Sequence, residues 1–424
     1  MERPVKRRRL IQAMSGGLVV GVAGCLGGDD DTGNGDDETG DDHDDHDDDL
    51  EHDHDDDEGE EGDAPGSDGH AYAFSPDTIA IIDPEAGEVV DEITDGIDDN
   101  GWGDTRITAD FGELYAIEES LDQVLVIDTE TREIVAEVDI GPDATHMYHP
   151  NDDEMWVHAD AEGTFYVIDT DDHSVIETVE SGLEAEGHGK LLYHEDFGSM
   201  GYATNVNDPG APVIDLENYE RSDFIEFDDE EQGTHYKAYA PETGLAYFEY
   251  GDVTVVVDTE DDEIVDELEF AGGMYLTPDE QILGVLDGDQ VRFLDATSDD
   301  SDELGAVDVG DGPDALRYYD GDDGLYAFTA HTMTDQASVI DVDALEVVET
   351  LAVGDIERPE DAHHLHRSAV AGDEYFFTPA EADGFVAVVN MAEQELIEHV
   401  EVADGVDTVQ YVGDSGTGYT GKLR

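Results

Sequence analysis

One sequence pattern occurs eight times between residues 79 and 402, and it constrains the fold more than any other feature. Each copy has an alternating β-branched run, an acidic turn and a second alternating run, as in "VLVIDTETREIVAEVDIG". Successive copies are 37 to 49 residues apart, which is the period of a four-stranded propeller blade. The first run of each copy ends on an acid or an amide, at Asp83, Asp128, Asp169, Asp215, Asp258, Asp295, Asp341 and Asn390.

Two further alternating segments separate consecutive copies, so each unit has four strands, which we name a to d from the central channel outward. The first copy begins at its second strand, "HAYAFS", whereas the chain ends with a spare inner strand, "DTVQYVG". The sequence therefore predicts an all-β propeller over residues 70–424. It has about eight four-stranded blades, with seven as the alternative, and the C-terminal strand closes the first blade.

The repeat resembles that of the YVTN propellers over about residues 71–421. This resemblance implies the fold and says almost nothing about function.

The first 25 residues have the pattern of an export signal. "KRRRLIQAMSGGLVVGVAGC" is basic, then weakly apolar, then rich in small residues, and it is too short to span a membrane. Its arginines resemble a twin-arginine signal and "VAGC" resembles a lipobox, which implies lipidation at Cys25. We expect a cell-surface lipoprotein on the outer side of the cytoplasmic membrane, with a short uncleaved anchor as the alternative. Cys25 is the only cysteine, so the exported domain has no disulfide and no thiolate site.

The chain is extremely acidic, with 115 Asp and Glu residues against 16 Lys and Arg and a formal net charge of −99. Multimolar salt shortens the Debye length and makes such self-repulsion tolerable, so the composition resembles that of proteins from halophilic archaea. A nucleic-acid-binding protein needs a basic surface that this chain lacks, and the membrane is expected to be contacted through the lipid alone. Cations are the expected ligands.

Residues 26–69 contain almost nothing apolar and cannot offset the entropy of ordering, so the sequence predicts a disordered acidic stalk. The stretch "DDHDDHDDDLEHDHDDD" adds four histidines, His43, His46, His52 and His54. We interpret it as a flexible metal-collecting arm; the alternative is a solvated stalk whose histidines have no role.

Seven further histidines are expected at one mouth of the propeller. Strand a starts at this mouth and strand b returns to it, so residues at the start of a and the end of b share one face. These residues are His146, His188, His235, His363 and His364 near the start of strand a, and His158 and His331 at the end of strand b. Several imidazoles with a carboxylate suit Zn²⁺, although Cu²⁺ would bind the same ligands more tightly.

The arm "HDDHDDDLEHDH" and the inner-strand motifs "ATHMYHP", "GHGK", "GTHYKAY" and "DAHHLH" together resemble the AztD-type zinc metallochaperones. That family consists of exported propellers that bind zinc and pass it to the substrate-binding protein of a zinc ABC transporter. The resemblance implies Zn²⁺ as cargo, that transporter component as partner, a monomer and no enzymatic activity. It implies the ligands His146, His188, His235 and His364, with His158, His331 and His363 close behind.

Two other function classes stay open at this point. A metal-dependent hydrolase or oxidoreductase is possible because a carboxylate beside a metal-bound water performs acid and base chemistry. The chain has no CxxCH haem motif and no nucleophile motif. The other class is a cell-surface propeller that binds a protein or a glycan through its rim.

Overall fold

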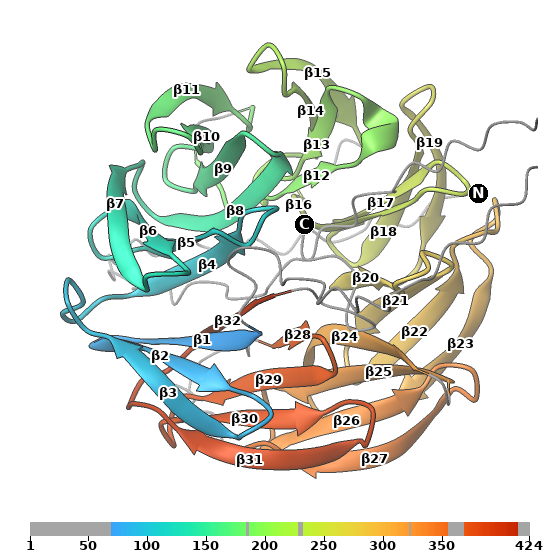
Figure 1. The fold of residues 1–424 in the computed structure, drawn as a ribbon. Coiled ribbons are helices and arrows are strands. Elements are labelled where there is room, and N and C mark those ends of the chain that lie inside the picture. The colour runs from blue at the N-terminus through green and yellow to red at the C-terminus, as the bar shows by residue number, and fades with distance from the viewer. Residues whose placement is uncertain (1–68, 184–185, 228–231, 322–323, 355–368, 414–424) are drawn as a thin grey trace, which may run out of the picture.

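The structure is a computed structural model that describes residues 69–183, 186–227, 232–321, 324–354 and 369–413. In these residues, eight four-stranded antiparallel sheets form a ring, and the only helical element is the short 3₁₀ turn η1 (Glu195–Phe197). Figure 1 shows the blades around the centre, with fourth strands such as β3, β11 and β27 at the outer rim. The prediction of an eight-bladed all-β propeller is confirmed.

The strands of blades 1 to 4 are given from the centre outward. They are β32 (Thr408–Val412), β1 (His70–Ser75), β2 (Thr78–Asp83), β3 (Glu88–Ile93); β4 (Trp102–Ile107), β5 (Glu113–Glu118), β6 (Gln123–Asp128), β7 (Glu133–Asp139); β8 (Ala144–Asn151), β9 (Glu154–Ala159), β10 (Thr164–Asp169), β11 (Val175–Glu180); β12 (Leu191–Tyr193), β13 (Met200–Ala203), β14 (Gly210–Asp215), β15 (Glu220–Glu226).

Blades 5 to 8 follow in the same order. Their strands are β16 (Thr234–Ala240), β17 (Leu245–Tyr250), β18 (Val253–Asp258), β19 (Glu263–Leu268); β20 (Met274–Leu276), β21 (Ile282–Asp287), β22 (Gln290–Asp295), β23 (Glu303–Asp308); β24 (Pro313–Gly321), β25 (Gly324–His331), β26 (Gln336–Asp341), β27 (Glu346–Ala352); β28 (Val370–Gly372), β29 (Tyr375–Ala380), β30 (Phe385–Asn390), β31 (Glu395–Glu401).

The repeated acid or amide of the sequence motif has a local structural cause. In every blade it is the last residue of the third strand, and its side-chain oxygen accepts a hydrogen bond from a backbone N–H two or three residues later. In blade 2, for example, Asp128 Oδ1 accepts from Thr131 N at 2.7 Å, and Arg132 then adopts a positive φ of 59°. This Asx turn joins the two outer strands, which explains why the pattern recurs with each blade.

The core lies between neighbouring blades. Along β5, Leu114 and Ala116 pack against blade 1, whereas Tyr115 and Ile117 pack against blade 3. Side chains of one strand alternate between the two faces of its sheet, so both faces of each blade are covered. Because each blade is sandwiched between two others, the direction of an inner side chain fixes which neighbour it meets.

The ring is closed as the sequence predicts. β32, the last strand of the described chain, pairs antiparallel with β1, and the register begins at His70 opposite Val412. Blade 1 therefore takes its inner strand from the C-terminal end. Within the described residues, no helix is long and apolar enough to cross a membrane.

Candidate metal centre

Three histidines from three consecutive blades meet at the mouth. His146 lies on β8, His188 precedes β12, and His235 lies on β16. One ring nitrogen of each lies within 4.8 Å of the corresponding nitrogens of the other two, and the Nε2 atoms of His146 and His188 are 3.0 Å apart. Tetrahedral Zn²⁺ with bonds of about 2.0 to 2.1 Å requires nitrogens about 3.3 Å apart. Small movements of the rings therefore suffice to enclose an ion.

A carboxylate lies against the Nδ1 atom of each of these histidines. Asp104 Oδ2 is 2.9 Å from His146 Nδ1, and Asp160 Oδ2 is 2.6 Å from His188 Nδ1.

Glu249 Oε2 lies 3.3 Å from His235 Nδ1 and completes the set. An ionised carboxylate only accepts hydrogen bonds, so it places the imidazole proton on Nδ1 and leaves the Nε2 lone pair for a metal. Metal-binding histidines characteristically have this outer partner.

The electrostatic environment favours the neutral form of His146 and the charged form of Asp160. Burial lowers the pKa of His146 well below its ordinary value, and electrostatic interactions with Lys190, His188 and His235 lower it further. Burial by itself would raise the pKa of Asp160, but the hydrogen bonds from His158 and His188 outweigh it and lower the pKa to about 2. Neutral imidazole is the form that binds metal.

The other two described mouth histidines lie at the ends of second strands, where the sequence places them, but they do not join this group. The ring of His158 is fully buried, with Nδ1 2.7 Å from Asp160 Oδ1 and Nε2 2.8 Å from Ser181 Oγ. His158 therefore helps to fix the carboxylate that holds His188. In blade 7, His331 Nε2 lies 3.0 Å from Ser338 Oγ.

Several predicted residues lie outside the described residues, and the structure gives no information on them. These are His363, His364, His43, His46, His52, His54 and Cys25.

The sequence analysis named the three histidines that the structure brings together, but it did not name the carboxylates beside them, Asp104, Asp160 and Glu249. In so acidic a chain a single carboxylate carries little information. The available signal was position: Asp104 lies on an inner strand, Asp160 directly follows a second strand and Glu249 lies near the end of another. All three positions are at the mouth, where the imidazoles were expected.

No protein-family model matches this chain, and no curated protein matches it in sequence. Solved structures are similar in fold. The dihydro-heme d1 dehydrogenase NirN, in complex with DHE, has a TM-score of 0.64 and 14% identity, over 83% of this chain and 77% of that one. Apo AztD from Citrobacter koseri has a TM-score of 0.60 and 13% identity, over 82% of this chain and 97% of that one.

Hydrazine synthase from Kuenenia stuttgartiensis is also similar, with a TM-score of 0.51 and 14% identity, over 68% of this chain and 95% of that one. At such identities these likenesses establish the propeller fold alone.

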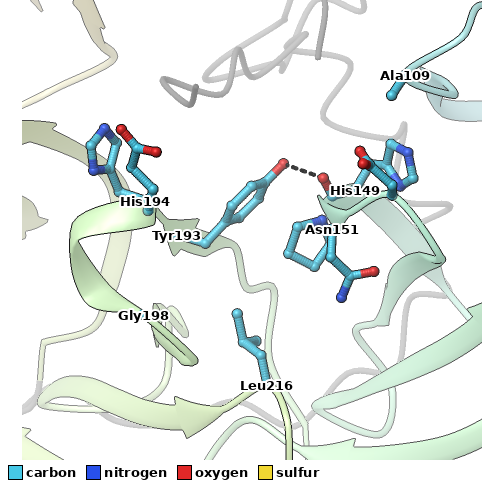
Figure 2. A pocket seen from close by; sticks show the side chains of 10 residues that line it. Ala109, His149, Asn151, Tyr193, His194, Gly198 and Leu216 are labelled. Carbon is cyan, nitrogen blue, oxygen red and sulfur yellow. Dashed lines mark hydrogen bonds between the residues drawn. The ribbon is translucent and has the colours of Figure 1, made fainter. Parts of the chain in front are cut away.

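A cavity of about 440 Å³ lies at the opposite face, between blades 3 and 4. His149 and His194, which the sequence places on that face, both line it. Figure 2 shows them on either side of Tyr193, whose hydroxyl donates a hydrogen bond to the backbone oxygen of His149 at 3.1 Å. The two imidazoles are therefore separated by the tyrosine ring and do not form a common donor set like that at the mouth.

Proposed function

We propose that this chain is an extracytoplasmic zinc metallochaperone. It holds Zn²⁺ between His146, His188 and His235 and passes the ion to the substrate-binding protein of a zinc ABC transporter. The observation that carries the proposal is the paired arrangement of the triad, in which each Nδ1 faces a carboxylate while one nitrogen of each ring lies near a shared point. The resemblance of the histidine motifs and the similarity of the fold to AztD also support it.

The triad suits cargo that must leave again. Three protein ligands leave a fourth position on Zn²⁺, through which an incoming ligand binds before the others dissociate. His146 is fully buried, whereas the side chains of His188 and His235 are each 17% exposed. The exposed side of the triad is therefore where a recipient protein gains access to the ion.

The N-terminal segment completes the proposal. Residues 1–25 act as a twin-arginine lipoprotein signal that attaches the mature chain through Cys25, and residues 26–69 act as a collecting arm. The acidic composition supports a halophilic archaeal source, where high salt screens the repulsion.

The proposal is tested by a transfer assay at multimolar salt. The zinc-loaded protein is mixed with the zinc-free substrate-binding protein of the source organism, or with a small chelator of equal affinity. We expect transfer to the protein to be faster than to the chelator and to rise with the concentration of the recipient. Equal rates of transfer to the protein and to the chelator, both limited by spontaneous dissociation of zinc, would mean that the propeller binds metal but does not deliver it.

The arm is expected to speed loading without contributing to the tight site. A segment that the sequence predicts to be disordered loses binding energy on ordering, whereas ligands on rigid strands lose little. Replacing the four arm histidines, His43, His46, His52 and His54, with Asn should therefore slow zinc loading at limiting metal and leave the equilibrium affinity unchanged. Stopped-flow loading and competition titration measure the two quantities. The matched control replaces four aspartates of the arm with Asn, namely Asp44, Asp47, Asp53 and Asp55. If both variants load zinc equally slowly, the arm acts through its overall composition and its histidines have no specific role.

A second function, metal-dependent hydrolysis, is favoured by one observation: three imidazole ligands resemble catalytic zinc sites, whose fourth position holds a water of lowered pKa. Hydrolysis of an activated ester by the zinc-loaded protein, lost in His235→Ala, would support it. Absence of turnover above that of free zinc would exclude it for that substrate class.

A further inference from the structure

Two buried lysines follow two of the triad histidines at the same spacing. Lysine is scarce in this acidic chain, and among the described residues it occurs only at Lys190 and Lys237. Lys190 stands two residues after His188, and Lys237 stands two residues after His235. The two lysines are only 1% and 8% exposed. Lysine is among the residues least often buried, so a buried pair beside the triad indicates a role at this site.

Lys190 lies beside His235. Its Nζ atom is 5.2 Å from the centroid of the Tyr236 ring, and the centroid of the His235 ring is 4.2 Å from that same centroid. The backbone N–H of Lys190 donates to Thr204 Oγ1 at 3.0 Å, and the Thr204 hydroxyl donates to the backbone oxygen of His235 at 2.9 Å. An electrostatic interaction also links Lys190 to His146. The charge of Lys190 therefore acts on two of the three triad histidines.

Lys237 has the corresponding position near His146. Its Nζ atom is 5.6 Å from the centroid of the Tyr148 ring, and the rings of Tyr148 and His146 are 6.5 Å apart between centroids. The negative face of an aromatic ring attracts an ammonium group. Each lysine is therefore positioned by a tyrosine whose ring neighbours a triad histidine.

A positive charge beside a metal site opposes the binding of a cation. The repulsion is strong in the protein interior, and it acts on both charges of Zn²⁺. Multimolar salt screens exposed charges over a few Å but screens buried charges much less. The three carboxylates beside the triad attract the ion, and the two ammonium groups offset part of that attraction.

We propose that Lys190 and Lys237 weaken the binding of zinc to the triad and speed its release. The inference rests on the zinc-binding role proposed above and adds the residues that adjust how tightly the ion is bound. Cargo has to leave the site, and a repulsive charge raises the dissociation rate without removing a ligand.

The test replaces each lysine with Met, which has an unbranched side chain without charge. Lys190→Met and Lys237→Met should each lower the dissociation constant for zinc by at least about tenfold and slow dissociation accordingly. Structural damage would have the opposite effect, because displaced ligands bind the ion less tightly. Competition titration against a zinc dye and chelator-driven dissociation in a stopped-flow instrument measure the two quantities, both on the full chain in multimolar NaCl.

Two controls separate the local charge from other causes. Lys190→Arg keeps the positive charge and should reverse most of the gain in affinity. Arg292→Gln removes one positive charge from β22 of blade 6, where Arg292 pairs with Asp287 and Glu303, and should leave the affinity unchanged. If Lys190→Met does not fold, Lys190→Gln serves the same comparison.

The outcomes distinguish this inference from the proposed function. Unchanged zinc affinity in the lysine variants would overturn the inference and leave the zinc-binding triad in place. Reduced affinity would also overturn it, because the ammonium groups would then assist binding. A gain in Arg292→Gln equal to that in the lysine variants would assign the effect to net charge and overturn it as well. Absence of tight zinc binding by the wild type would overturn the proposed function, and this inference with it.

Discussion

Replacing His188 and His235 together with Ala should abolish tight zinc binding by the propeller, with an affinity loss of more than about 1,000-fold. The change leaves His146 as the only imidazole of the triad, whereas zinc sites in proteins have at least three protein ligands. The loss should exceed the 10- to 100-fold effect of removing an outer partner. Both side chains are partly exposed, so their truncation should cost the fold little. Competition titration against a zinc dye in multimolar salt measures the affinity.

The matched control is His331→Gln, which changes a mouth histidine of blade 7 whose Nε2 contacts Ser338 and not the triad. It should keep the wild-type affinity. The arm remains present in both variants, so fast, weak binding should persist in each. A double variant that binds zinc within about tenfold of the wild type would show that the tight site lies elsewhere.

Replacing Asp160 with Asn should lower zinc affinity by about 10- to 100-fold. One oxygen of Asp160 holds His188 and the other holds His158, and an amide cannot accept on both sides. The lost acceptor leaves a buried imidazole without its partner, which should also lower the free energy of unfolding by about 1 to 3 kcal/mol. Competition titration and denaturant unfolding measure the two effects.

Asp171→Asn, an exposed change in the same blade, is the control and should alter neither quantity. The pKa of Asp160 is lowered to about 2 from 3.8, so its contribution to stability is present above pH 3.8 and is lost as pH falls through 2. The difference in stability between wild type and variant should therefore be constant between pH 5 and 8. A difference that disappears within that range would contradict the assigned charge of Asp160.

The sequence predicted the fold because its signal repeats once per blade. The Asx turn at Asp128 and its seven equivalents needs an acid or amide at a fixed point, so blade number and strand order follow from spacing. The spare strand ending at Val412 likewise predicted how the ring closes. These are local requirements of the backbone, and they leave a direct trace in the sequence.

The site was only partly predictable. Strand direction tells which face of the propeller a residue lies near, but it does not tell which residues of other blades its side chain meets. His331 lies at the mouth as expected, but it belongs to blade 7, whereas the triad comes from blades 3 to 5. His158 lies in the same blade as His146, but its Nε2 is at Ser181 Oγ. Which nitrogens meet depends on the direction of each side chain within its blade, and spacing alone does not encode that.

The most direct measurement is anomalous diffraction at the zinc edge from crystals of the full chain grown with one equivalent of Zn²⁺. We expect one strong peak about 2.0 to 2.1 Å from a ring nitrogen of each of His146, His188 and His235. The same experiment on the His188→Ala/His235→Ala protein should show no peak there. A strong zinc peak elsewhere in the propeller with the triad empty, or no ordered zinc at all, would show that His146, His188 and His235 do not form the zinc site.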